Sequence, residues 1–341
     1  MPRIPGKLAL LATGTLAAAI LIRLRRERTG LSFDRKVVLI TGGSRGLGLA
    51  LAEEIAKSGA RLAICARDAG ELSEAEARLK RLGAEVLAKP CDVSDEDAMY
   101  RFVNDVEQHF GRIDILINNA GIIMVGPART FTAEDLRRSM DTIYWGAVFP
   151  TLAVLPGMTG RGAGSIVNIT SIGGYLSVPH LLPYSAAKFA LAGFSVGLSA
   201  ELSGTGVNVT TVVPDVMRTG SYRHARFKGQ HQKEYGWFAT GASLPLSSIS
   251  VPHAVRTILS AVRRGDAVAL VGWKSQLAAR LHGLFPDKVV KALGLANRLL
   301  PDQPPDDGQE LPGHACESPV TRSFLTELGR RAGHRYNEYR S

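Results

Sequence analysis

Short apolar runs alternate with amphipathic segments through the central chain, and this alternation limits the fold more than any other feature. The apolar runs are typical of buried strands and cover 36–41, 61–66, 85–93, 113–121, 164–171, 207–214 and 267–272. The segments between them have helical spacing and cover 49–60, 71–84, 95–111, 132–157, 183–203 and 252–265. This order predicts an α/β fold whose parallel sheet is covered on both faces, with a ligand crevice at the carboxyl ends of the strands.

The stretch TGGSRGLG (41–48) joins the first expected strand to the first expected helix. Glycines let the backbone approach a pyrophosphate, and a helix N-terminus offers free N–H groups and positive potential. A tight turn without a ligand is the alternative interpretation. The strand–turn–helix context favours a dinucleotide site.

The end of the second expected strand, CARD (65–68), indicates which dinucleotide fits. A carboxylate there would accept a hydrogen bond from the adenosine ribose and repel a 2′-phosphate. The chain instead carries Arg67, and Arg45 in the glycine turn is a second cation, so NADP(H) is predicted over NAD(H). Asp68 is the counter-argument, because it can pair with Arg67 or disfavour the phosphate. Either arginine can also be ordinary surface charge.

Charge and cysteine content argue against other classes of protein. The net charge is +10, but half of the excess lies in residues 1–30, and no basic run with interleaved aromatics follows. Nucleic-acid binding is therefore not expected. The three cysteines, Cys65, Cys91 and Cys316, are far apart, which argues against a disulfide framework or zinc site and favours a reducing compartment. No metal site is predicted.

The N-terminal stretch 8–22 carries no charge and is followed by RLRRER. A cleaved signal peptide would end in a small-residue site rather than in arginines. A spanning helix needs about 20 apolar residues, which residues 8–24 just reach if the arginines snorkel. An interfacial anchor would need a stronger polar face, and a buried or flexible helix is the remaining alternative. We expect membrane attachment through residues 8–24, with the main body facing the cytoplasm.

Six short motifs now point to a family, and they occur in that family's order. They are TGGSRGLG (41–48), CDV (91–93), NNAG (118–121), ITS (169–171), YSAAK (184–188) and VVPDVMRT (212–219). From about residue 34 to 272 the chain resembles the short-chain dehydrogenase/reductases. The resemblance implies a single doubly wound Rossmann domain with strand order 3-2-1-4-5-6-7, a nicotinamide cofactor, and a homodimer or homotetramer.

The resemblance also assigns cofactor-binding roles to the motif residues. Those implied to hold the pyrophosphate are Gly42, Ser44, Arg45, Gly46, Leu47 and Gly48. Those implied to contact adenine are Asp92 and Val93, and those implied to line the adenosine ribose are Asn119, Ala120 and Gly121. Those implied to face the nicotinamide are Pro214 and Thr219.

Ser171, Tyr184 and Lys188 are the implied catalytic residues, and Tyr184 and Lys188 also contact the cofactor. Tyr184 and Lys188 stand at i and i+4, so both side chains lie on one helical face. Lys188 would bind the nicotinamide ribose and favour the Tyr184 phenolate, and Tyr184 would transfer the proton as general acid or base. Ser171 would hydrogen-bond the same substrate oxygen.

Two residues depart from the family pattern. Ile143 stands where the family carries an asparagine that helps to hold a water connecting the lysine to solvent, so proton resupply is slower or a backbone carbonyl suffices. Asp215 stands where a glycine usually follows the proline of PG. Its carboxylate is either harmless in the loop or close enough to the substrate to disfavour anions.

The expected organisation has four parts: an anchor with its basic flank (1–30), a catalytic domain (31–275) with a substrate lid at 220–250, an amphipathic helical extension (276–300), and a linker and tail (301–341). The extension is expected to pack on the domain, dimerise or touch a membrane. The leading hypothesis is an NADP(H)-dependent oxidoreductase acting on a lipophilic carbonyl or secondary alcohol. Its rival, motivated by Ile143, is a weakly active or non-catalytic NADP(H)-binding scaffold or sensor.

Overall fold

The computed structural model describes residues 30–302 and 309–339, so the predicted membrane segment 8–24 lies outside the described residues. The longer strands are β1 (Val37–Thr41), β2 (Arg61–Ala66), β3 (Val86–Pro90), β4 (Ile115–Asn118), β6 (Gly164–Ile169), β7 (Val207–Pro214) and β11 (Val268–Val271). The helices are α2 (Gly46–Ala56), α3 (Ala69–Arg81), α4 (Glu96–Phe110), α5 (Ala133–Met140), α6 (Gly146–Gly160), α7 (Leu182–Glu201), α8 (His231–Ser243), α9 (Val251–Arg264), α10 (Trp273–Leu284), α11 (Pro286–Asn297) and α12 (Glu327–Arg335).

The longer strands form one parallel sheet in the order β11-β7-β6-β4-β1-β2-β3. Counted along the chain within this sheet, that is the predicted order 3-2-1-4-5-6-7, so the predicted doubly wound α/β fold is confirmed. The order reverses direction between β1 and β4, and a ligand crevice forms beyond the carboxyl ends of the strands at such a point.

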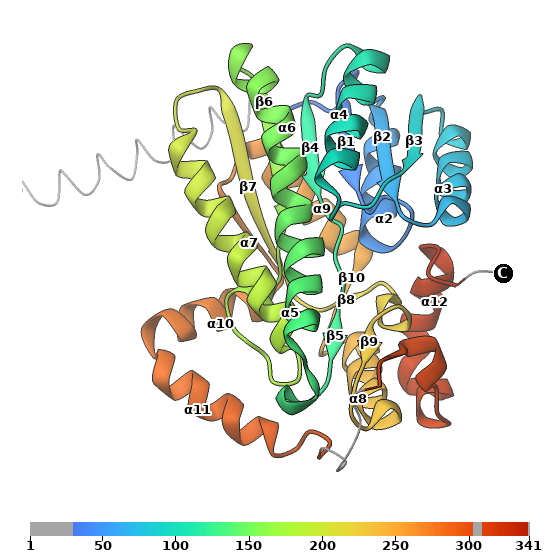
Figure 1. Ribbon diagram of the computed structural model, residues 1–341, viewed down its shortest axis with the longest axis vertical. Coiled ribbons are helices and arrows are strands. Elements are labelled where there is room, and N and C mark those ends of the chain that lie inside the picture. The colour runs from blue at the N-terminus through green and yellow to red at the C-terminus, as the bar shows by residue number, and fades with distance from the viewer. Residues whose placement is uncertain (1–29, 303–308, 340–341) are drawn as a thin grey trace, which may run out of the picture.

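Strand β1 shows why the apolar runs are nearly continuous. Val38 and Ile40 belong to the core that α2, α3 and α9 cover, whereas Val37 and Leu39 belong to the core under α4 and α6. Successive strand side chains point to opposite faces of a sheet, and here both faces are buried. Figure 1 shows α6 and α7 crossing in front of the sheet, with α9 behind it.

The helix expected over 132–157 is interrupted. Helix α5 runs into a π-helical turn at Asp141–Trp145 before α6 begins. A π-turn changes the direction of side chains and frequently occurs at functional sites. The turn contains Ile143, so the irregular backbone forms here without the asparagine that the family usually carries.

The C-terminal part of the chain differs from the expected linker and tail. Leu311–Pro312 forms a strand, β12, which pairs antiparallel with β9 (Arg226–Phe227), and β9 in turn pairs with β5 (Met124–Val125). A second small sheet joins β8 (Met217–Arg218) to β10 (Ile249–Ser250). Figure 1 shows α12 beside α8, while α10 and α11 extend away at the opposite side. Among the helices in residues 30–302 and 309–339, none is both long and apolar enough to cross a bilayer.

Candidate active site

The glycine turn and the NNAG segment are held together at the carboxyl edge of β1 and β4. The Thr41 hydroxyl accepts from the backbone N–H groups of Asn119 and Ala120, at 3.0 and 3.2 Å. Asn119 Nδ2 donates to the carbonyls of Thr41 and Gly42 at 3.1 and 3.0 Å. The residues predicted for the pyrophosphate and for the ribose therefore lie side by side.

Two glycines of the turn leave no room for a side chain. Gly42 has a φ of 66°, in the left-handed region, and a Cβ on Gly48 would lie 2.1 Å from the Gly42 carbonyl oxygen. The backbone thus passes close to the start of α2, as a phosphate cradle requires. The Leu47 side chain packs into the core, so only its backbone faces the turn. These features fit a dinucleotide.

The two arginines predicted for a phosphate have different surroundings. Arg45 Nη1 donates to both carboxylate oxygens of Glu71 at 2.6 and 2.7 Å, and Ser44 Oγ donates to Glu71 Oε2 at 3.2 Å. The Arg67 side chain is 63% exposed and lies 3.9 Å from the Asp92 carboxylate. Asp68 accepts from the Glu71 N–H and so caps α3. Arg67 is therefore the more accessible cation.

Asp92 and Val93 follow β3 at the same edge of the sheet. Asp92 Oδ1 accepts from the backbone N–H and the hydroxyl of Ser94 at 3.0 and 2.7 Å, which fixes the turn. Val93 is buried, and a Cβ on Gly146 would lie 2.7 Å from its Cγ2. The pair is thus rigidly placed next to the start of α6.

Ser171, Tyr184 and Lys188 converge where β6 ends and α7 begins. Lys188 Nζ donates to the Ile169 carbonyl at 2.7 Å and lies 5.8 Å from the centre of the Tyr184 ring. Burial lowers the pKa of Lys188 to about 7. Burial raises the pKa of Tyr184, while a hydrogen bond with the Ser171 hydroxyl opposes that rise. The three predicted catalytic side chains therefore form one group.

Ile143 lies in this group's surroundings. It is 1% exposed and packs in an apolar cluster with Ala187 and Leu191, against which Tyr184 also packs. A side chain on Gly121 would come within 3.8 Å of both Ile143 Cγ1 and Lys188 Nζ. The departure from the family pattern thus places an aliphatic side chain near the lysine, where it contributes to desolvation of the ammonium group.

Pro214 and Thr219 lie at the end of β7 and just beyond it. Pro214 is opposite Val271 in the sheet, and the buried Thr219 Oγ1 donates to Ser221 Oγ at 2.9 Å. The main chain between them contains the small strand β8. Both predicted nicotinamide contacts are therefore on the carboxyl side of the sheet, the side that holds the glycine turn.

Asp215, for which the sequence left two interpretations open, contacts the start of α10. Its carboxylate accepts from the backbone N–H groups of Lys274 and Ser275, the latter at 2.5 Å, and so caps α10 from a distant part of the chain. A Cβ on Gly272 would lie 2.1 Å from Asp215 Oδ2, so only glycine fits beside it. The carboxylate faces the start of α10, which supports the interpretation that it is harmless in the loop.

Replacing Asp215 with alanine is expected to lower the free energy of unfolding by about 1–3 kcal/mol, because two helix N–H groups lose a charged acceptor. Urea denaturation measures the change. Asp287→Ala is the control, since Asp287 lies on the exposed surface of α11 and its ion pair with Lys291 is also exposed; it should stay within about 0.5 kcal/mol of the parent. Unchanged stability of Asp215→Ala with an altered preference for anionic substrates would contradict the capping role.

The sequence analysis missed a buried His180–Glu234 pair that connects the lid to the loop before Tyr184. His180 Nδ1 lies 2.9 and 3.0 Å from the two carboxylate oxygens of Glu234, and Trp237 Nε1 donates to Glu234 Oε2 at 2.8 Å. The pair joins the loop before Tyr184 to α8. Glu71 was also missed. Neither glutamate has a sequence signal that separates it from an ordinary helix-surface residue, because its partner lies far away in the chain.

Comparisons with known proteins agree with this geometry. The family model described as short chain dehydrogenase matches residues 36–228. The SadH protein of Mycobacterium tuberculosis is 34% identical over 76% of this chain and 96% of its own. The 11-beta-hydroxysteroid dehydrogenase 1A of Arabidopsis thaliana is 38% identical over 57% of this chain and 56% of its own.

A solved structure shows the same similarity. The F189W actinorhodin polyketide ketoreductase with NADPH has a TM-score of 0.63 and 28% identity, over 71% of this chain and 98% of its own.

 The crystal structure of levodione reductase has a TM-score of 0.61 and 26% identity, over 72% of this chain and 98% of its own. The family match over residues 36–228 covers the strands from β1 to β7, the glycine turn and the Ser171, Tyr184 and Lys188 group. The chain therefore belongs to the short-chain dehydrogenase family.

Proposed function

We propose that this protein transfers a hydride between NADP(H) and a carbonyl or secondary alcohol, with Tyr184 as the general acid or base. The proposal rests on one observation: Ser171, Tyr184 and Lys188 converge at the carboxyl edge of the sheet, which also carries the glycine turn. When bound, the nicotinamide cofactor supplies or accepts the hydride. Turnover of a panel of carbonyl compounds with NADPH tests the proposal.

The chain's own residues handle the proton and the substrate oxygen. The Ser171 hydroxyl and the Tyr184 hydroxyl together hold the oxygen of the C=O or C–OH group, and Tyr184 gives or takes its proton. Lys188 in its charged form favours the Tyr184 phenolate, and its pKa of about 7 lets it change charge near neutral pH. The Ile143 cluster excludes water from this side of the lysine.

NADP(H) is proposed over NAD(H) because Arg67 is accessible at the end of β2. Arg67→Ala is expected to weaken NADPH binding by about tenfold, since a charged hydrogen bond to a phosphate is lost, and to leave NADH binding nearly unchanged. Fluorescence titration of both cofactors measures the difference. Arg129→Ala, at an exposed position in the short turn Ala128–Thr130, is the control. Equal losses for the two cofactors would argue against a 2′-phosphate contact.

A lipophilic substrate is proposed from the lid. Trp237 and Phe238 of α8 and Val178 of the loop before Tyr184 join one apolar cluster with Tyr184 itself. The name of the Arabidopsis thaliana relative indicates a steroid substrate for that protein, which supports the same class here. Within the carbonyl panel, apolar ketones should give higher kcat/KM than small polar ones of equal reactivity.

The rival function, a non-catalytic or weakly active NADP(H)-binding scaffold, is supported by the buried Ile143. It predicts tight NADPH binding without turnover of any panel compound. Restoring a polar group by Ile143→Asn would distinguish the two, because a scaffold should gain no activity from it. An enzyme limited by proton resupply should gain turnover if the variant folds, which circular dichroism checks.

We also propose attachment to a membrane through residues 8–24, with the catalytic domain facing the cytoplasm. The support is the uncharged run followed by arginines. Sedimentation of the full chain with vesicles, compared with a chain lacking residues 1–30, tests it. Equal partitioning of the two proteins would refute the attachment.

A further inference from the structure

The last described residues fold back over the glycine turn. We call residues 333–339 the C-terminal strap. The Tyr336 carbonyl accepts from the Gly46 N–H at 2.8 Å. Asn337 Nδ2 donates to the carbonyls of Ser44 and Glu71 at 3.1 and 3.3 Å. Thus the strap binds backbone groups of the turn that is predicted to hold the cofactor pyrophosphate.

Glu338 is the residue of the strap that enters most deeply. It is 4% exposed, and a Cβ on Gly46 would lie 2.6 Å from its Oε1. Its Oε2 lies 3.4 Å from Arg45 Nε and 3.4 Å from His224 Nε2, and it makes no hydrogen bond among the described residues. A carboxyl buried in this way is uncommon in a folded protein.

The strap also reaches the opposite side of the crevice. A Cβ on Gly220, the residue after Thr219, would lie 2.5 Å from Gly333 Cα and 3.4 Å from Glu338 Cβ. His224 Nε2 lies 3.1 Å from the Glu338 carbonyl oxygen, in hydrogen-bonding contact. The strap therefore connects the glycine turn to the segment after β8, on either side of the place where a dinucleotide would lie.

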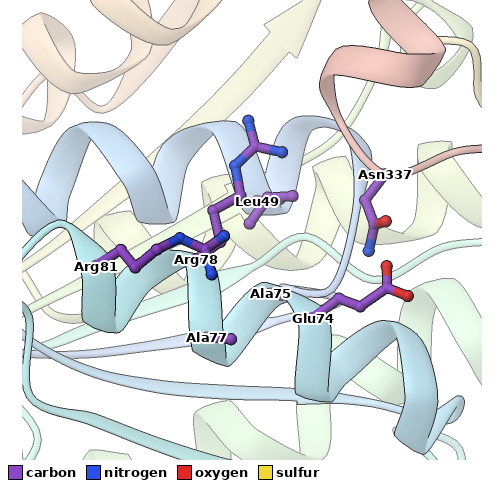
Figure 2. Close-up of a pocket in the computed structure, with 7 residues that line it drawn as sticks. All are labelled: Leu49, Glu74, Ala75, Ala77, Arg78, Arg81 and Asn337. Carbon is purple, nitrogen blue, oxygen red and sulfur yellow. The ribbon is translucent and has the colours of Figure 1, made fainter.

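Figure 2 shows the outer end of this contact. Asn337 projects toward α3 at the edge of a cavity of about 290 Å³, which Leu49, Ala75 and Arg78 also line. None of the predicted catalytic residues lines that cavity. The cavity marks imperfect packing between the strap and the α2–α3 surface.

The free N–H groups and positive potential at a helix N-terminus attract anions, and Glu338 stands beside this end of α2. We propose that the strap is an intramolecular plug of the dinucleotide site, in which Glu338 takes the place of a cofactor phosphate and leaves when the cofactor binds. The proposal rests on the proposed function, because it takes the glycine turn as a dinucleotide site.

The surroundings of Glu338 explain why the plug can be displaced. Burial raises the pKa of this carboxyl to about 8, and the charged or titratable groups that face it are Arg45, Glu71, Arg223 and His224. Burial lowers the pKa of His224 to about 4, so it is neutral at pH 7. Because burial disfavours its charged form, the docked carboxyl uses the anion-binding potential less well than a pyrophosphate, which keeps its charges.

Hydrogen–deuterium exchange of the full chain tests the plug directly. NADPH is expected to speed exchange at residues 333–339 by about tenfold or more, because the strap must leave an occupied site. Glu338→Ala and Asn337→Ala are expected to bind NADPH more tightly, by about three- to tenfold, since a larger fraction of molecules has an open site. Misfolding of a variant would weaken NADPH binding, so tighter binding distinguishes an opened site from a misfolded protein.

Arg331→Ala is the matched control. The Arg331 side chain lies on α12, is 75% exposed and pairs with Glu327 of the same helix, so the NADPH affinity of the variant should equal that of the parent. Slower exchange of residues 333–339 with NADPH, or weaker binding by the two strap variants, would make the strap a clamp and overturn the plug. Binding with unchanged exchange would also overturn it. If neither NADPH nor NADH bound the parent or any variant, Glu338→Ala included, the proposed function would be overturned as well.

Discussion

Tyr184→Phe is expected to lower kcat by about 10²- to 10⁴-fold with the best substrate of the carbonyl panel, because the variant keeps the ring but has no proton to transfer. NADPH affinity should change little, since the packing of the ring against the Ile143 cluster remains. The measurement is steady-state NADPH oxidation together with a fluorescence titration of the cofactor.

Tyr100→Phe is the control for this change, because Tyr100 is 42% exposed on α4, away from the three catalytic candidates. Its kcat should match that of the parent. If Tyr184→Phe turned over substrate as fast as the parent, Tyr184 would not be the proton donor. If neither protein turned over any compound while both bound NADPH, the scaffold function would be favoured.

Lys188→Met should have two opposite effects. Activity should fall by at least about 10²-fold, because the charge that favours the Tyr184 phenolate is lost. The cofactor-free protein should nevertheless become more stable by about 2–4 kcal/mol at pH 6, because methionine carries no charge to desolvate. Urea denaturation at several pH values measures the stability.

The stability gain of Lys188→Met should depend on pH. The folded protein releases the Lys188 proton near pH 7, whereas the unfolded chain keeps it up to the ordinary value of 10.5. Between these values the unfolded state binds more protons, so the parent gains stability as the pH rises. The advantage of Lys188→Met should therefore be largest below pH 7 and shrink toward pH 10.5.

A second buried lysine provides the contrast. Lys228 Nζ pairs with Asp135 Oδ2 at 2.6 Å, and both side chains are buried. Lys228→Met should lower stability by about 3–5 kcal/mol, because it leaves a buried carboxylate without its cationic partner. If both lysine variants changed stability in the same direction, desolvation of Lys188 would not be the dominant effect.

Local pattern predicted the framework of this protein. The runs 36–41 and 61–66 became β1 and β2 because a parallel strand with both faces buried must be apolar along its whole length. The glycine turn was equally predictable, since its function depends on residues within a few positions of one another. The i, i+4 spacing likewise put Tyr184 and Lys188 on one face of α7.

Contacts between residues far apart in the chain could not be predicted from the sequence. Asp215 caps α10 through backbone groups of Lys274 and Ser275, and no local pattern relates these positions. Arg45 looked like a free phosphate ligand, but Glu71 of α3 holds it. A side chain's partner depends on how the helices pack on the sheet, which only the complete fold decides.

Local periodicity and short spacing were enough to predict the α/β architecture and the glycine turn, and the resemblance to a known family added the three catalytic candidates. The position of Glu338 against Gly46 became visible only in the folded chain, because Glu338 belongs to a segment that was expected to be a tail. Such a contact forms because the C-terminal chain folds back over the edge of the sheet. Burial and electrostatics then bring together residues that are far apart in the sequence and share no local pattern.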